Sequence, residues 1–307
     1  MTPPPSSSSR QRPAFGRQGP GQIPHAVLEA LDLVVARRAA GALPGDRRAA
    51  GLGAGTELAQ LRPYEVGDDV RQIDAAATAR TGSPHVRLHV PERTLTTWIA
   101  LDVSPSMAFG TARRLKSDVG EGVTLVVGRL AVRRAGSVSL MTFGAGRPRL
   151  HPPRASRPGV VALQRALSEG VAADGVGDPS ALATALRRIG KVATQPGLVV
   201  VISDFRDQEG WTRPLGALRE RHSVLAVEVR DPREDSIPAV GRLAVVDPET
   251  GERLQIDTSR RGFRERFEAL EAEGRALVAR ELRRLEVEHV VLSTEEDWLH
   301  VLGRRLR

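Results

Sequence analysis

The sequence predicts an α/β fold built around a mainly parallel β-sheet with helices on both of its faces. Short apolar runs such as those at 97–103 and 197–203 have the length of strands and do not alternate with polar residues. Such runs are typical of strands buried on both faces. They alternate along the chain with longer segments in which apolar residues recur at helical spacing, and that alternation favours a parallel sheet covered by helices.

The elements follow in order from a low-complexity N-terminus. Residues 1–22 are rich in Pro, Ser, Gly and Arg and are predicted to be disordered. Residues 23–39 carry an apolar stripe at helical spacing, and 23–96 is expected to form a small N-terminal module. The large domain is expected at 97–307. Its strands are predicted at 97–103, 137–143, 197–203, 223–229 and 288–292, and its helices near 113–134, 159–169, 180–192, 210–220, 262–285 and 295–306.

A β-hairpin is predicted within the large domain at about 241–257. Two short apolar runs, at 243–246 and 254–256, flank the residues Asp-Pro-Glu-Thr-Gly at 247–251. Proline, aspartate and glycine between apolar runs favour a tight turn.

The composition excludes several classes of protein. The chain of 307 residues has 40% hydrophobic but only 3% aromatic residues, so Val, Leu, Ile and Ala must build its core. It has no cysteine, which excludes disulfides, thiolate metal sites and a cysteine nucleophile. No apolar stretch approaches the 18 residues or so of a membrane span. The first residues lack the apolar segment of a signal peptide, so a cytoplasmic protein is expected.

A formal net charge of +8 and a pI near 11.0 raise the possibility of nucleic-acid binding. All but two of the 45 basic residues are arginines, the exceptions being Lys116 and Lys191, and the arginines alternate with acidic residues. Aromatic side chains that could stack on bases are scarce. Nucleic acid is therefore an unlikely partner, although a basic nucleic-acid-binding module is kept as an alternative function.

A carboxylate and two hydroxyls follow the first predicted strand directly. Asp102, Ser104 and Ser106 form an Asp-x-Ser-x-Ser run that starts at the end of the strand at 97–103 and precedes the helix at 113–134. The carboxyl end of a parallel strand is where α/β proteins place ligand sites. Three hard oxygen donors suit a hard divalent cation, above all Mg²⁺. The run also has a structural interpretation, as a turn and N-cap that satisfy backbone amides at a helix start.

A second acidic residue, Asp204, follows another continuous apolar strand. Together with Asp102 and its two serines, it resembles the metal-ion-dependent adhesion site of von Willebrand factor A domains. That resemblance implies a doubly wound, von Willebrand A-like fold for the large domain. Ser180 stands where such domains usually have a threonine ligand, and Asp178 and Thr184 are the alternatives. In such sites an Asp or Glu of a protein partner completes the Mg²⁺ shell.

A longer motif precedes the large domain. Residues 62–74 read Arg-Pro-Tyr-Glu-Val-Gly-Asp-Asp-Val-Arg-Gln-Ile-Asp, followed by Ala-Thr-Ala-Arg-Thr at 77–81 and Glu-Arg at 92–93. This combination resembles the signature of a bacterial family called domain of unknown function 58, and the resemblance covers roughly residues 25–307. It implies an adaptor that works beside a MoxR-type AAA+ ATPase in remodelling or maturing protein complexes. The family usually has Trp after the Ile-Asp pair, where this chain has Ala75.

The polar residues of this motif have two interpretations. They can form a partner-contact face, or a salt-bridge network, including Arg93, that fixes the small module. The candidates for partner contact are Tyr64, Asp68, Asp69, Arg71, Asp74 and Arg80.

The main catalytic alternative is a phosphotransferase or phosphatase that uses Asp102 as nucleophile. Haloacid-dehalogenase enzymes also place an aspartate after the first strand, but they need a second carboxylate two residues later as general acid and base. Here that position is Ser104, which cannot do this proton chemistry at neutral pH. The chain also lacks a phosphate-binding loop ending in Gly-Lys-Ser/Thr. The sequence therefore favours a protein that is not an enzyme.

Overall fold

The computed structural model describes residues 57–90, 95–133, 135–206 and 209–305. They belong to two compact units, one within Leu43–Leu95 and one that begins at Thr96, and each is considered by itself. The predicted tail at 1–22 and the predicted helix at 23–39 lie outside the described residues.

The small unit is a two-stranded antiparallel sheet whose connection carries two short helices. Strand β1 (Glu57–Pro63) pairs with β2 (His85–Val90). Between them lie the 3₁₀ helix η1 (Val70–Gln72) and the helix α2 (Ala75–Thr81).

The large unit is built on a six-stranded sheet in which every strand is parallel to its neighbours except the edge strand β5. The strand order is β10-β7-β6-β3-β4-β5. This confirms the predicted α/β class with a mainly parallel sheet. The strands are β3 (Thr96–Asp102), β4 (Ser137–Phe143), β5 (Arg149–Ala155), β6 (Leu198–Ser203), β7 (Ser223–Arg230) and β10 (Glu288–Ser293).

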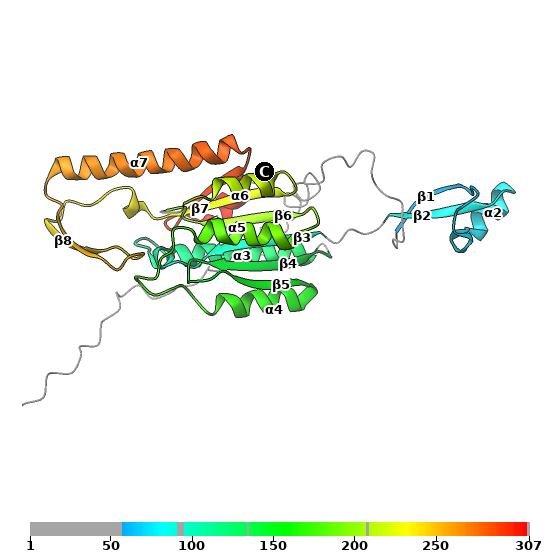
Figure 1. Cartoon of the computed structure of the whole chain (residues 1–307), viewed down its shortest axis with the longest axis horizontal. Helices are drawn as coiled ribbons and strands as arrows, with labels where there is room; N and C mark the ends of the chain where they lie inside the picture. The colour runs from blue at the N-terminus through cyan, green and yellow to red at the C-terminus, as the bar shows by residue number, and fades with distance from the viewer. Residues whose placement is uncertain (1–56, 91–94, 134, 207–208, 306–307) are drawn as a thin grey trace, which may run out of the picture. The chain divides into compact units, whose positions relative to one another are not determined.

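Helices cover both faces of this sheet (Figure 1). Side chains of β3 alternate between the two faces: Ile99 and Leu101 pack in the core under α3, α4 and α8, and Trp98 and Ala100 pack in the core under α5, α6 and α7. The helices are α3 (Lys116–Arg133), α4 (Ser156–Leu167), α5 (Ala181–Val192), α6 (Thr212–Arg219), α7 (Arg261–Arg284) and α8 (Trp298–Arg305).

Three short elements extend the carboxyl edge of the sheet. The 3₁₀ helix η2 (Pro105–Ala108) follows β3, and η3 (Pro232–Glu234) follows β7. The predicted hairpin is present as β8 (Arg242–Val246) paired antiparallel with β9 (Arg253–Asp257). The hairpin extends past one end of the sheet, and the first residues of α7 extend past the same end (Figure 1).

Strand β5 is the one strand of the large sheet that the sequence pattern does not predict. It contains Pro152 and Pro153, and none of its residues is buried. Proline lacks an amide donor, so it is tolerated at a sheet edge and rarely inside a sheet. A strand that needs only one hydrogen-bonded neighbour can therefore carry a sequence typical of a loop.

Among the described residues, no helix combines the length and the apolar character that crossing a membrane requires.

Candidate metal centre

The two predicted acidic ligands meet at one edge of the sheet. Strands β3 and β6 are neighbours, and Leu101 pairs with Ile202, so Asp102 lies beside Ser203. From β3 the chain continues toward β4, and from β6 it continues toward β7 on the other side. This reversal is the position where doubly wound sheets bind ligands. Asp102 and Asp204 are 1% and 5% exposed, so both carboxylates are buried there.

The loop after β3 brings two hydroxyls to the same place. Asp102 Oδ1 accepts a hydrogen bond from the Ser104 amide at 2.9 Å, and its Oδ2 accepts one from the Ser203 hydroxyl at 2.5 Å. The hydroxyls of Ser104 and Ser106 lie 3.0 Å apart, and both serines are buried. The Ser106 side chain is also near Asp204 and acts to lower the pKa of that carboxyl. Four of the five predicted ligands therefore lie in one buried cluster.

Neighbouring segments fix this loop. Gly144, in the turn after β4, has a φ of +95°, and a Cβ at that position would lie 2.6 Å from the Ser104 amide nitrogen. Only glycine allows this close approach. Farther along, the buried Asp231 accepts hydrogen bonds from the Thr111 amide at 2.7 Å and from the Thr294 hydroxyl at 2.6 Å. Asp231 thus joins the loops that follow β3, β7 and β10.

Lys116 is a buried cation at this site that the sequence analysis did not identify. Its ammonium donates to Asp204 Oδ2 at 2.6 Å and also contacts the Glu234 carboxylate. The lysine side chain is 0% exposed. A lysine at the first position of a helix opposes the helix dipole, so this placement is explained by the two carboxylates. The signal in the sequence is that Lys116 is one of only two lysines in an arginine-rich chain.

The two aspartates have opposite electrostatic environments. Burial, and after it the nearby Asp204 charge, raise the pKa of Asp102 to about 7. Burial also acts to raise the pKa of Asp204, but the adjacent Lys116 ammonium outweighs it and holds that pKa below its ordinary value. Asp204 and Glu234 together outweigh the effect of burial on Lys116, and its pKa is raised. Lys116 and Asp204 therefore form a stable ion pair, and Asp102 titrates near neutrality.

In the absence of metal, the stability of wild-type protein relative to Asp102→Asn should fall as the pH rises from 4 to 8. The folded pKa of Asp102, about 7, lies above its ordinary value of 3.8. Over that range the folded state binds more protons than the unfolded state, so the contribution of Asp102 is fully present below its unfolded pKa and is lost as the pH rises through its folded pKa. Urea unfolding of both proteins in chelator measures the difference. A constant difference between pH 4 and pH 8 would contradict the raised pKa.

Ser180, the predicted third hydroxyl ligand, does not belong to the buried cluster. It is exposed, and its hydroxyl donates to Asp178 Oδ1 at 2.8 Å. Asp178 Oδ1 also accepts from the Ser180 amide. The alternative Thr184 is half-buried, and its hydroxyl accepts from Arg187. All three lie in or next to the first turn of α5, and among the described residues none of their side-chain hydrogen bonds reaches Asp102 or the two serines.

A third carboxylate approaches the cluster from the β8–β9 hairpin. Glu249, in the hairpin turn, accepts a hydrogen bond from the Ser106 amide through Oε1 at 3.0 Å. Its backbone carbonyl accepts from the Gly177 amide at 3.0 Å. The sequence predicts the hairpin but not this contact.

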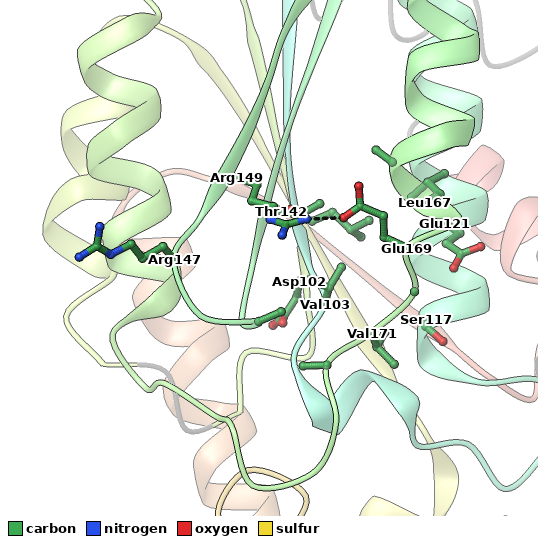
Figure 2. A pocket seen from close by; sticks show the side chains of 15 residues that line it. Asp102, Val103, Ser117, Glu121, Thr142, Arg147, Arg149, Leu167, Glu169 and Val171 are labelled. Carbon is green, nitrogen blue, oxygen red and sulfur yellow. Dashed lines mark hydrogen bonds and ion pairs between the residues drawn. The ribbon is translucent and has the colours of Figure 1, made fainter.

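A cavity of about 170 Å³ borders Asp102 on the side of α3 and α4. Figure 2 shows Asp102 lining it together with Ser117 and Glu121 of α3. The Arg149 side chain pairs with Glu169 at 2.6 Å, and Arg147 extends away from Asp102 (Figure 2). The cavity is large enough to hold several water molecules beside the carboxylate.

The donor set fits a hard divalent cation. It consists of oxygen atoms alone, from two carboxylates and two hydroxyls, and Mg²⁺ prefers such ligands with water completing its shell. No group of three or more His, Asp or Glu side chains that could hold a metal occurs in the described parts of the chain, so a metal here must rely on the serines. Lys116 already supplies one positive charge to Asp204 and Glu234. Within the part of the chain that the structure describes, no ion pair joins Asp102 to a cationic side chain, whereas Asp204 is paired with Lys116.

The partner-contact candidates of the small unit divide into two groups. Asp68 accepts from Arg62 at 2.6 Å, and Asp69 and Asp74 cap η1 and α2 by accepting from the amides of Arg71 and Ala77. These acids stabilise local structure, two of them as caps. Tyr64 is half-buried, and Arg71 and Arg80 are exposed. Arg93 lies outside the described residues.

Comparison with known proteins shows the family of this chain. It belongs to the family described as "Protein of unknown function DUF58", whose model matches residues 60–277. It is 36% identical over 279 residues to uncharacterised proteins of Mycobacterium bovis and Mycobacterium tuberculosis, covering 89% of this chain and 86% of each relative. Among solved structures it is similar to the conserved hypothetical protein BatB from Bacteroides thetaiotaomicron, with a TM-score of 0.41 and 16% identity over 69% of this chain and 97% of that one.

Proposed function

We propose that this protein is a non-catalytic interaction adaptor whose large unit is a von Willebrand A-like domain with a metal-ion-dependent adhesion-type site. Asp102, Ser104, Ser106 and Asp204 would hold Mg²⁺, with Ser180 as a further candidate. One observation carries the proposal: two buried carboxylates and two buried hydroxyls lie together at the sheet position where strand order reverses.

The residues around the cluster have distinct roles in this proposal. Ser203 and the Ser104 amide orient Asp102, and Lys116 fixes Asp204. Because Lys116 neutralises one buried carboxylate, the cluster is held in place before any metal binds. Mg²⁺, when bound, would offer a coordination position to a carboxylate of a protein partner.

A binding role accounts for the chemistry better than catalysis does. Ser104 stands where a phosphate-transferring enzyme of this kind needs a second carboxylate. In the cavity beside Asp102, Arg149 is paired with Glu169 and Arg147 is turned away, so neither cation is aimed at a phosphate on Asp102. The family resemblance supports a MoxR-type AAA+ ATPase as the partner, in the cytoplasm, in remodelling or maturation of protein complexes.

The test is capture of partners from the native cell by the tagged full chain, in Mg²⁺ and in chelator. We expect a MoxR-type ATPase to be retained in Mg²⁺ and lost in chelator, and lost in both conditions by Asp102→Ala. Thermal melts of the variant control for folding. Equal capture in Mg²⁺ and chelator, unaffected by Asp102→Ala, would rule out a metal-bridged interaction.

A further inference from the structure

The hairpin turn covers the candidate metal centre with a carboxylate of the chain itself. The Glu249 side chain reaches the Ser106 amide. A carboxylate in this position contacts the backbone of one of the two serines, and a partner carboxylate would have to arrive at the same loop. The contact is between residues 143 positions apart, so it depends on the folded hairpin and not on local chain geometry.

The turn is seated on the loop that precedes α5. The Gly175 amide donates to the Pro248 carbonyl at 2.8 Å, and the Gly177 amide donates to the Glu249 carbonyl at 3.0 Å. A Cβ at Gly177 would lie 2.7 Å from the Glu249 Cβ. Glycine is therefore needed at 177 for the turn to sit in this position. The turn is held on this loop by a few backbone hydrogen bonds at the surface, and such contacts open at low free-energy cost.

An apolar groove of about 710 Å³ begins at the same serine. Ser106 lines one end, and the hairpin, the segment after η3 and the start of α7 form its walls. Its apolar residues include Ile237, Leu254 and Phe263, and the last two are 51% and 38% exposed. Exposed apolar side chains gathered in a groove mark an interaction surface. Two arginines and Glu234 also line this groove. Arg206 is paired with Glu271, so the exposed Arg233 is the cation whose charge favours an acidic occupant.

We infer that this face binds a segment of a partner protein in which one aspartate or glutamate is flanked by large apolar side chains. The partner carboxylate takes the position that Glu249 holds at Ser106, and the flanking side chains enter the groove between the hairpin and α7. Glu249 thus acts as an internal competitor that the partner must displace. The inference rests on the proposed function, since it names the kind of partner that the site recognises.

The test uses a fluorescent peptide of about ten residues with one central aspartate flanked by leucine and phenylalanine. A matched peptide carries asparagine in place of the aspartate. Binding to the full chain is measured by fluorescence anisotropy in Mg²⁺ and in chelator.

If Glu249 covers the site about nine-tenths of the time, Glu249→Ala should bind the aspartate peptide about tenfold more tightly than wild type. Glu252→Ala, which changes an exposed carboxylate in the same turn, should bind like wild type. Leu254→Gln should bind more weakly.

Three outcomes separate this inference from the proposed metal centre. Unchanged affinity in Glu249→Ala, or equal affinity for the aspartate and asparagine peptides, overturns the inference. Binding of Mn²⁺, measured by electron paramagnetic resonance and lost in Asp102→Ala, without binding of the aspartate peptide overturns the inference and leaves the metal centre standing. Tighter peptide binding by Glu249→Ala that is the same in Mg²⁺ and in chelator supports the groove and overturns the metal bridge.

Discussion

Replacement of Lys116 by methionine should lower the free energy of unfolding at pH 7 by about 3–5 kcal/mol, the usual cost of breaking a buried ion pair from one side. Methionine keeps most of the length and apolar volume of lysine, so the change mainly removes the charge. It leaves Asp204 and Glu234 without the cation that they share, with side chains only 1% and 11% exposed. Urea unfolding in chelator measures the loss.

Two comparisons test whether this loss is electrostatic. The double variant Lys116→Met, Asp204→Asn should regain part of the lost stability, because it removes one of the two negative charges that Lys116 compensates. Lys191→Met changes the other lysine of the chain, which is exposed, and should stay within about 0.5 kcal/mol of wild type. Mg²⁺ should stabilise Lys116→Met more than wild type, since a divalent cation replaces the missing positive charge. A Lys116→Met protein as stable as wild type would contradict the described ion pair.

Asp102→Asn should abolish stabilisation by Mg²⁺ while leaving the metal-free protein folded. Asparagine can still accept from the Ser104 amide and can donate to the Ser203 hydroxyl, so both hydrogen bonds of Asp102 have substitutes. It removes the buried negative charge beside Asp204 that opposes folding at neutral pH. In wild type, Mg²⁺ at about ten times its dissociation constant should add about 1.4 kcal/mol to the free energy of unfolding.

The measurement is the melting temperature of both proteins in chelator and across a Mg²⁺ titration. For a domain of this size, 1 kcal/mol corresponds to a shift of about 2–4 °C. Ser180→Ala is the companion variant, because its hydroxyl is bound to Asp178 and is expected to matter less. If Mg²⁺ stabilises Asp102→Asn as much as wild type, the ion binds elsewhere.

The position of the two aspartates was predictable from the sequence, because each follows a continuous apolar strand. Parallel strands end at the same edge of a sheet, so Asp102 and Asp204 had to meet there unless their strands were far apart in the sheet. Ser203 could have been found by the same reasoning, since it is the last residue of β6. Strand β5 could not, because Pro152 and Pro153 are typical of a loop and only pairing with β4 makes them part of a strand.

The contacts that complete the cluster depend on tertiary structure alone. Lys116 begins a helix and gives no sign in the local pattern that it is buried between Asp204 and Glu234. Glu249 belongs to a turn whose sequence predicts a hairpin. That sequence does not predict that the Glu249 carbonyl accepts a hydrogen bond from the Gly177 amide. Ser180 was placed by analogy with threonine in a resembling family, and the local hydrogen bond to Asp178 competes for its hydroxyl.

The long separations within the cluster have a consequence for biosynthesis. Asp102 and Ser203 are 101 positions apart, and Ser106 and Glu249 are 143 apart. At a translation rate of about 5–20 residues per second, the ribosome adds Glu249 roughly 7–30 s after Ser106. A nascent or truncated chain that stops before β6 has neither Ser203 nor Asp204, and one that stops before the hairpin exposes the serines without their cover. The candidate site is therefore complete, with all its acidic and hydroxyl groups and its cover, only after both β6 and the hairpin have been made.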